Sequence, residues 1–182
     1  RQQLDDYKTS HDLILMLSDI VSRGGNFLLD IGPDADGNIP VILQQRLLDI
    51  GDWLKINGEA IYGTVAKKQP AQWSEGYKVP KSDKSFMADY KVSRLVVPKK
   101  DTSYIESFFT KKGNNTYCII PSYRKSITIN DIHLAKNSKA EILGSSVHCA
   151  WKQKGNQVTI DLSNLKPGDI SGSGIFVIKL TE

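Results

Sequence analysis

Asp30, Asp34 and Asp36 are the residues in the first third of the chain whose types and spacing could do chemistry. Carboxylates two residues apart can hold a calcium ion, but Asp34-Ala-Asp-Gly-Asn lacks most of the ligands of an EF-hand loop. The same run is typical of a turn that leads into a helix, where the N-terminal dipole stabilises acidic side chains. We favour the turn over a metal site and keep Asp34 and Asp36 as candidates for a binding role.

Glu59 and Tyr62 form a second pair that could resemble a catalytic site. They follow a predicted helix at the end of the first structural unit of the chain. We therefore expect them to lock this unit to the next one, with burial of the aromatic ring as the driving force.

Metal chemistry has little support in the sequence. The two cysteines, Cys118 and Cys149, are not spaced as a zinc site, and the three histidines, His11, His133 and His148, are scattered. We expect both cysteines to lie on strands as small buried hydrophobes, and we favour this over a disulfide.

The elements that must position these residues change in type along the chain. Apolar residues at helical spacing predict a helix from about residue 10 to Gly24, and a stripe from Leu43 to Leu54 predicts a second helix after Pro40. Between them, the apolar run over residues 26–31 resembles a parallel strand covered on both faces, which places Asp30 inside a buried strand. Helix, strand and helix in this order are one and a half units of an α/β fold, too little for a domain alone.

Short β-branched and aromatic runs separated by turns follow from about residue 93 and predict an antiparallel β-sandwich. The runs Lys112-Gly-Asn-Asn and Lys154-Gly-Asn are typical of hairpin turns. The predicted strands cover residues 94–97, 104–110, 116–120, 126–130, 140–143, 147–153, 157–162 and 175–180. We predict that residues 67–92, which contain Pro70, Gly76 and Pro80, form a linker or irregular wrap.

The net charge changes at the same place, from −5 over residues 1–66 to +9 over residues 67–182. Such a step is typical of two different structural units. The positive excess is mostly lysine scattered in ones and twos, which favours solubilising loops over nucleic-acid binding. No apolar run is long enough to span a bilayer, and residues 1–10 contain no signal peptide.

The strongest motif is Gly-Gly-Asn-Phe-Leu-Leu-Asp-Ile-Gly-Pro over residues 24–33. Together with Leu-Ile-Leu-Met-Leu-Ser-Asp-Ile-Val-Ser over residues 13–22 and with residues 34–40 and 53–64, it resembles the α-L-fucosidases of glycoside hydrolase family 29. The hairpin around residues 109–120 and the segment Ile142-Leu-Gly with Trp151 are similar to the family's sandwich, so the resemblance covers nearly the whole chain.

The resemblance implies a multidomain α/β plus all-β fold. Residues 1–66 would be the last βα units of a (β/α)8-like catalytic barrel, residues 67–92 a linker, and residues 93–182 the antiparallel β-sandwich. Family members are retaining enzymes that hydrolyse terminal α-L-fucose from glycans with two carboxyl groups about 5–5.5 Å apart. Both groups lie upstream of residue 10 in the family, so we assign no catalytic residue, metal or cofactor here. Asp30 departs from the pattern, since many relatives have Asn at this position.

On a barrel, the loop after a strand faces the active site, so the resemblance makes Asp34 and Asp36 candidates for the rim of the sugar pocket. The implied partners are a fucosylated glycan and the rest of the barrel, an oligomer is possible, and the implied location is secreted, periplasmic or lysosomal. The alternative is a non-catalytic sandwich that binds carbohydrate or is purely structural. Aromatic residues could then form a sugar platform, although a core or interface role is favoured. These aromatics are Trp73, Tyr77, Phe86, Tyr90, Tyr104 and Tyr123.

Overall fold

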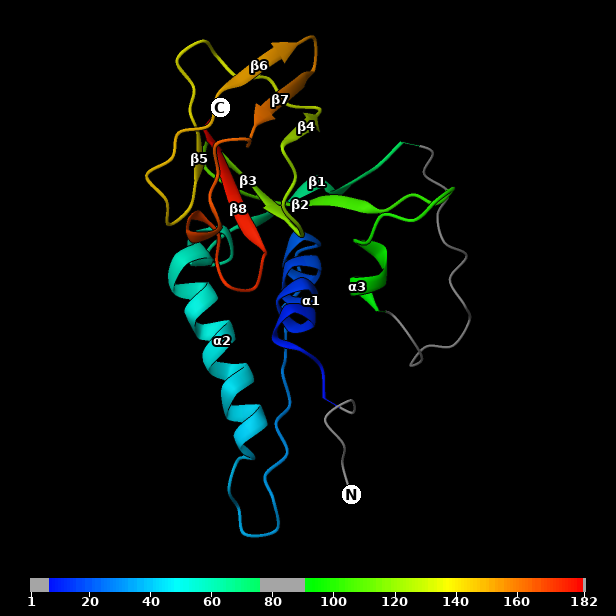
Figure 1. Cartoon of the computed structure of the whole chain (residues 1–182), viewed down its shortest axis with the longest axis vertical. Coiled ribbons are helices and arrows are strands. Elements are labelled where there is room, and N and C mark those ends of the chain that lie inside the picture. Colours follow the sequence, from blue (N-terminus) through cyan, green and yellow to red (C-terminus); the bar gives the residue numbers. More distant parts are fainter. Residues whose placement is uncertain (1–6, 76–90, 182) are drawn as a thin grey trace.

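In the computed structural model, which describes residues 7–75 and 91–181, two helices precede strands that form two antiparallel sheets (Figure 1). The elements in chain order are α1 (Ser10–Ser22), α2 (Val41–Asn57), η2 (Gly58–Ala60), β1 (Val65–Trp73), α3 (Val92–Leu95), β2 (Ile105–Lys112), β3 (Asn115–Ile120), β4 (Ser126–Asn130), β5 (Ala140–Ile142), β6 (Trp151–Lys154), β7 (Gln157–Asp161), η3 (Pro167–Asp169) and β8 (Phe176–Thr181).

Helix α1 begins and ends where the sequence predicts. The Thr9 hydroxyl accepts a hydrogen bond from the Asp12 backbone N–H at 3.1 Å, and the Asp12 carboxylate accepts one from the Thr9 backbone N–H. This reciprocal capping satisfies two N–H groups at the helix start that would otherwise lack partners. Gly24 follows the helix with φ of +81°, a conformation that glycine adopts without strain.

Helix α2 follows Pro40, as predicted, and is covered on one side only. Trp53 is 2% exposed, whereas Leu48 is 62% exposed and Val41 is 80% exposed. Leu47, in the predicted apolar stripe, is 36% exposed. The helix therefore leaves an apolar surface open, as expected for part of a larger domain.

The buried strand predicted over residues 26–31 does not form among the residues that the structure describes. The segment forms no sheet with any described residue, and Leu28 is 92% exposed. A parallel strand needs hydrogen-bonded neighbours on its edges, and no described segment supplies them. Asp30 is consequently exposed rather than buried.

The strands form a five-stranded sheet, in the order β1-β2-β3-β8-β5, and a three-stranded sheet, in the order β4-β7-β6. Both predicted hairpins are confirmed: Gly113 turns between β2 and β3, and Gly155 turns between β6 and β7, each with a positive φ. All pairings between the named strands are antiparallel, so the two sheets form a sandwich as the short strands indicate.

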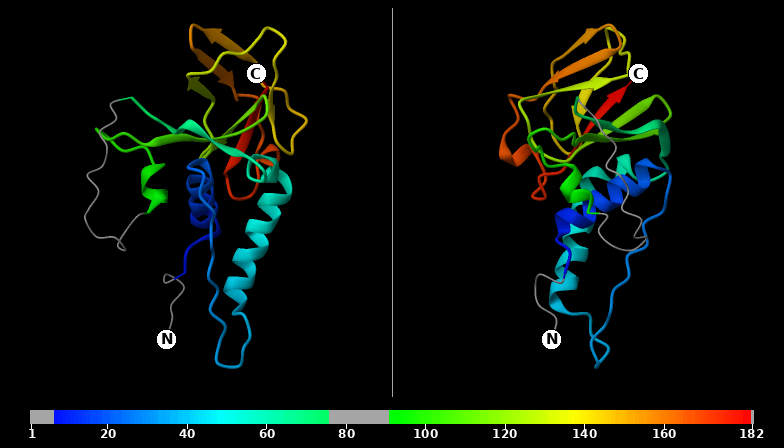
Figure 2. Two further views of the ribbon diagram at one scale, coloured as in Figure 1. Left: turned by 180° about the vertical axis from the view of Figure 1, so that it is seen from behind. Right: turned by 90° about the vertical axis from the view of Figure 1, so that its right-hand side faces the viewer.

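The five-stranded sheet is the middle layer of three, as the side view shows (Figure 2). Cys118 and Ile120 of β3 point into the core shared with the three-stranded sheet. Tyr117 and Ile119 alternate with them and point toward α1 and α2. This sheet is thus buried on both faces, and its helix-side face meets the unit that carries the fucosidase-like motif.

Three further boundaries differ from the sequence prediction. Residues 67–73, predicted as linker, belong to β1, which pairs with β2 despite Pro70 because the ladder is interrupted between Ala66 and Ala71. Residues 76–90 of the predicted linker lie outside the described residues. The predicted strand 94–97 is replaced by the short helix α3, and the strand predicted from residue 147 begins only at Trp151.

Candidate functional site

Glu59 connects the helical unit to the sandwich. Its Oε1 accepts hydrogen bonds from the Tyr117 hydroxyl and the Lys179 ammonium, each at 2.7 Å. Tyr117 of β3 and Lys179 of β8 lie opposite each other in the sheet, so one carboxylate caps a cross-strand pair. We call these three residues the Glu59 clamp.

The electrostatics of the Glu59 clamp are those of a structural contact. The hydrogen bonds from Lys179 and then from Tyr117 lower the pKa of Glu59. Burial and then the Glu59 carboxylate raise the pKa of Tyr117 to about 12. The carboxylate and the protonated phenol are thus both stabilised, and neither is prepared to transfer a proton near neutral pH. The locking role predicted for Glu59 agrees with this geometry, but Tyr62 is 61% exposed and contributes no aromatic burial.

Two buried hydrogen bonds fasten the same junction. The Trp53 indole N–H of α2 donates to the Ile175 carbonyl at 2.8 Å, and the Thr110 hydroxyl of β2 donates to the Ala60 carbonyl at 2.7 Å. Both donors are buried, so each bond satisfies a polar atom that would otherwise be costly inside the protein.

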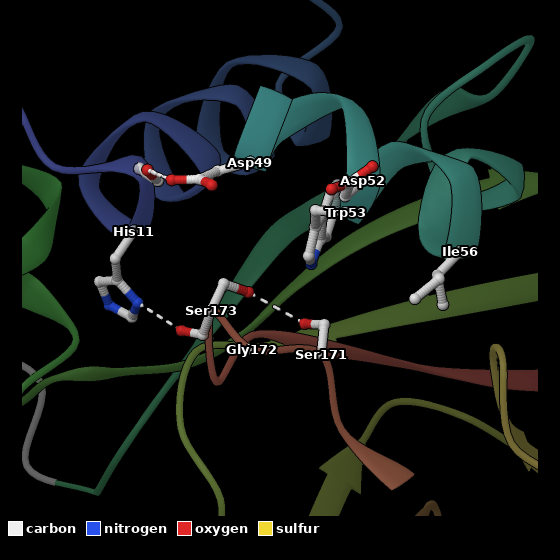
Figure 3. A pocket seen from close by; sticks show the side chains of 9 residues that line it. His11, Asp49, Asp52, Trp53, Ile56, Ser171, Gly172 and Ser173 are labelled. Carbon is white, nitrogen blue, oxygen red and sulfur yellow. Dashed lines mark hydrogen bonds between the residues drawn. The ribbon is translucent and has the colours of Figure 1, made fainter. Parts of the chain in front are cut away.

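A cleft of about 510 Å³ lies where the start of α1, the C-terminal half of α2 and the loop before β8 meet (Figure 3). In the close-up, His11 points at Ser173, while Trp53 and Ile56 project from α2 beside Ser171. The lining residues are Ser10, His11, Asp49, Asp52, Trp53, Ile56, Ser171, Gly172 and Ser173.

Hydrogen bonds fix the polar groups of this cleft. His11 Nδ1 lies 2.9 Å from the Ser173 carbonyl, which can only accept, so Nδ1 carries a proton and Nε2 of the neutral ring is an acceptor. The Asp49 carboxylate accepts hydrogen bonds from Ser10 and from Gln45, and these lower its pKa. Asp52 pairs with Lys55 at 2.7 Å on the exposed side of α2.

The structure places Asp34 and Asp36 on an exposed turn between α1 and α2, at the far end of α2 from the sandwich (Figure 1). Asp34 Oδ1 accepts from the backbone N–H groups of Asp36 and Asn38 at 3.0 and 2.8 Å. This use of Asp34 is the turn chemistry that the sequence predicts. Neither residue lines the cleft at the junction.

Each described aromatic residue of the predicted platform contacts another part of the protein. Trp73 packs against the core between the helices and the sheet, and Tyr104 lies under the Arg124 guanidinium, 5.6 Å from it. Tyr123 is 46% exposed and donates to the Leu162 carbonyl. Tyr77, Phe86 and Tyr90 lie outside the described residues.

Both cysteine side chains are buried in the core between the two sheets, as thiols. Cys118 lies on β3 as predicted, whereas Cys149 lies just before β6 rather than on a strand. Among residues 7–75 and 91–181, no group of three or more His, Cys, Asp or Glu side chains could hold a metal ion. None of the described helices is long and apolar enough to cross a membrane.

Comparison with known proteins identifies the family. A family model described as alpha-L-fucosidase matches residues 1–59. An alpha-L-fucosidase from Dictyostelium discoideum is 54% identical over 63 residues, which are 35% of this chain and 14% of the relative. The human tissue alpha-L-fucosidase is 30% identical over 181 residues, which are 98% of this chain and 33% of the relative. The chain belongs to the α-L-fucosidase family.

Solved structures extend the relationship over the whole fold. The Thermotoga maritima alpha-fucosidase, in complex with a mechanism-based inhibitor, superposes with a TM-score of 0.70 and 25% identity. The match covers 100% of this chain and 36% of the solved fucosidase chain. The chain thus spans about a third of the length of its full-length relatives and corresponds to their C-terminal part.

In the described part of the chain, the carboxyl groups whose pKa departs from its ordinary value are stabilised in the charged form, unlike a catalytic proton donor. In retaining hydrolysis, one of the two catalytic carboxyls must carry a proton, which requires a raised pKa. Every described carboxyl whose pKa clearly departs from its ordinary value has it lowered. These carboxyls are Asp12, Asp49, Glu59 and Asp161.

The sequence gives no indication of the cleft. His11 and Ser173 are 162 residues apart in sequence and meet only because β8 returns to the middle of the sheet beside α1. Asp49 lies on the side of α2 that faces α1, where it accepts a hydrogen bond from Ser10, but helical periodicity alone does not say which polar residues of a helix face a neighbour. No local signal in the sequence could have found this group.

Proposed function

We propose that the chain is the C-terminal part of a retaining α-L-fucosidase that hydrolyses terminal α-L-fucose from glycans. The observation that carries this proposal is that fucosidases of known structure match along the whole chain and not only over the family motif. The catalytic carboxylates are proposed to lie in the part of the enzyme that precedes this chain.

Helices α1 and α2 and the segment between them would complete the catalytic barrel. The exposed apolar side chains support this role, because Leu28, Leu48 and Val41 lie open to solvent although each would be stabilised by burial. Residues 26–31, extended but without a sheet partner, would become the last barrel strand once neighbouring strands flank them.

The sandwich would hold this end of the barrel in place. The Glu59 clamp, the Trp53 indole and Thr110 all connect it to the end of α2 through buried or charge-assisted hydrogen bonds. The packing of Trp73 against the helix-side core and the contact of Tyr104 with Arg124 favour this structural role over an aromatic sugar platform.

For Asp34 and Asp36 we propose a position at the rim of the fucose pocket. Their loop directly follows the segment proposed as the last barrel strand, and such loops face the active site of a barrel. The Asp36 side chain is the better candidate for a sugar contact, since Asp34 Oδ1 is occupied by its own turn. A secreted, periplasmic or lysosomal location is proposed from the family relationship alone.

The test is hydrolysis of an aryl α-L-fucoside by the full-length protein, with the anomer of the released fucose followed by NMR. Turnover with α-L-fucose as the first product supports the proposal. Release of the β-anomer first, or turnover of other aryl glycosides without turnover of the fucoside, contradicts it.

A further inference from the structure

The cleft between α1, α2 and the loop before β8 gathers polar groups from three parts of the chain. Around its mouth lie the His11 ring, the Asp52 carboxylate and the hydroxyls of Ser171 and Ser173 (Figure 3). Ile56, 44% exposed, provides an apolar wall beside them. Small-molecule sites of roughly 300–1,000 Å³ combine apolar walls with a few converging polar groups, and this cleft of about 510 Å³ falls in that range.

A small cavity next to the cleft contains a buried acceptor that lacks a donor. Asn57, at the end of α2, is 1% exposed and donates through Nδ2 to the Trp53 carbonyl at 3.2 Å. Its Oδ1 has no hydrogen-bond partner among the described residues. Asn57 lines a cavity of about 60 Å³ whose lining shares Ile56 and Ser171 with the cleft. A hydroxyl or a water at this point would satisfy Oδ1, since a buried polar atom is rarely left without a partner.

The charges around the cleft define the class of ligand. Its lining contains no lysine or arginine, so it offers no charged group to an anion. Asp49 already faces Arg46 at 3.9 Å and Asp52 faces Lys55 at 2.7 Å, so a cationic ligand would gain little net attraction. Both carboxylates and His11 Nε2 still have acceptor capacity for neutral hydroxyl groups.

We propose that this cleft binds a neutral sugar residue of a glycan. A ring hydroxyl would donate to Asp52 or to His11 Nε2, Ile56 would contact the apolar face of the ring, and the inner hydroxyl would reach Asn57 directly or through a water. The choice of a glycan as the source of the hydroxyls rests on the proposed function. The binding itself needs no fucose and no hydrolysis.

The experiment measures binding of the full-length protein to immobilised N-acetyllactosamine, a neutral disaccharide without fucose, with its sialylated form as the anionic comparison. Asp52→Asn tests the cleft, and Asp161→Asn, an exposed carboxylate on β7 of the other sheet, is the matched control. His11→Gln is the second cleft variant, and thermal melts verify that all proteins are folded.

We expect the neutral disaccharide to bind and the sialylated form to bind more weakly. Asp52→Asn and His11→Gln should each reduce the affinity roughly tenfold, the effect of losing one hydrogen bond to a polar ligand, while Asp161→Asn leaves it unchanged. The absence of binding, equal binding by folded cleft variants and wild type, or stronger binding of the sialylated form would overturn the proposal. Because the probe contains no fucose, each of these outcomes is separate from the fucoside assay.

Discussion

The Tyr117 hydroxyl of β3 donates to Glu59 Oε1 at 2.7 Å, and the two residues are 58 positions apart in the chain. Tyr117 is fully buried and Glu59 follows the last turn of α2, so this hydrogen bond joins the helix-side face of the five-stranded sheet to the end of the helical unit. Lys179 donates to the same carboxylate oxygen, which makes Glu59 the shared acceptor of the junction.

Tyr117→Phe is expected to destabilise the full-length protein by about 1–1.5 kcal/mol. A hydrogen bond to a charged group contributes more to stability than a neutral one. Because the Glu59 side chain is 43% exposed, we expect a loss of stability at the lower end of the range for hydrogen bonds to charged groups. Urea unfolding measures the difference. The matched control is Tyr123→Phe, whose hydroxyl is partly exposed and donates over 3.3 Å, with an expected loss below about 0.5 kcal/mol. Equal losses in the two variants would contradict the role of the Glu59 clamp.

The Glu59 clamp should make stability depend on pH in the acid range. Lys179 and Tyr117 lower the pKa of Glu59 in the folded state below the ordinary value of 4.5. Its contribution is therefore fully present above pH 4.5 and is lost as the pH falls through the lowered folded-state pKa. We expect the stability difference between wild type and Glu59→Gln to be constant from pH 7 to about pH 5 and to shrink below pH 4.5. Denaturant unfolding at several pH values measures this stability difference. A difference that grows as the pH falls would contradict the lowered pKa of Glu59 in the folded state.

The thiols of Cys118 and Cys149 should be inert in the folded protein. Cys118 is fully buried, and burial, followed by the charge of Asp161, raises the pKa of Cys149 to about 11. Because the thiolate is the reactive form, a thiol reagent at pH 8 should react slowly with the native chain. After unfolding without reductant, two thiols should react. Fewer than two would indicate a disulfide.

Residues 1–182 alone are expected to self-associate through α2. Val41, Leu47 and Leu48 form part of an apolar surface that no described segment covers. Replacement of Leu47 and Leu48 by lysine should shift the purified chain toward monomer in analytical ultracentrifugation. Val65→Lys, on an exposed position of β1, is the matched control and should change little. A wild-type chain that is fully monomeric would contradict self-association through α2.

The sandwich could be predicted from the sequence because short local patterns specify its strands and turns. Val158 and Ile160 alternate with polar residues, and Gly113 and Gly155 sit in turns that need a positive φ. The missed strand β1 illustrates the limit, since Pro70 and its polar neighbours are typical of a linker. This stretch joins the sheet only because β2 offers it an edge.

In the helical unit, the local sequence pattern does not predict which residues are buried. The run over residues 26–31 has the composition of a buried strand, yet Leu28 and Asp30 in it are exposed because burial depends on partners outside the segment itself. The same holds for the cleft, where His11 meets Ser173 through the path of β8 and not through any spacing in the sequence. Local pattern therefore predicted both long helices and most of the strands, and the motif resemblance indicated the family, while tertiary contacts determined which side chains meet.

The most direct test of the account compares turnover of an aryl α-L-fucoside by the full-length protein and by the purified chain of residues 1–182. We predict turnover by the full-length protein and none by the 182-residue chain, verified as folded by circular dichroism, because both catalytic carboxyls are proposed to lie in the part of the enzyme that precedes this chain. Turnover by the 182-residue chain that is abolished by Asp34→Asn or Asp36→Asn would place the catalytic centre on this chain and contradict the account.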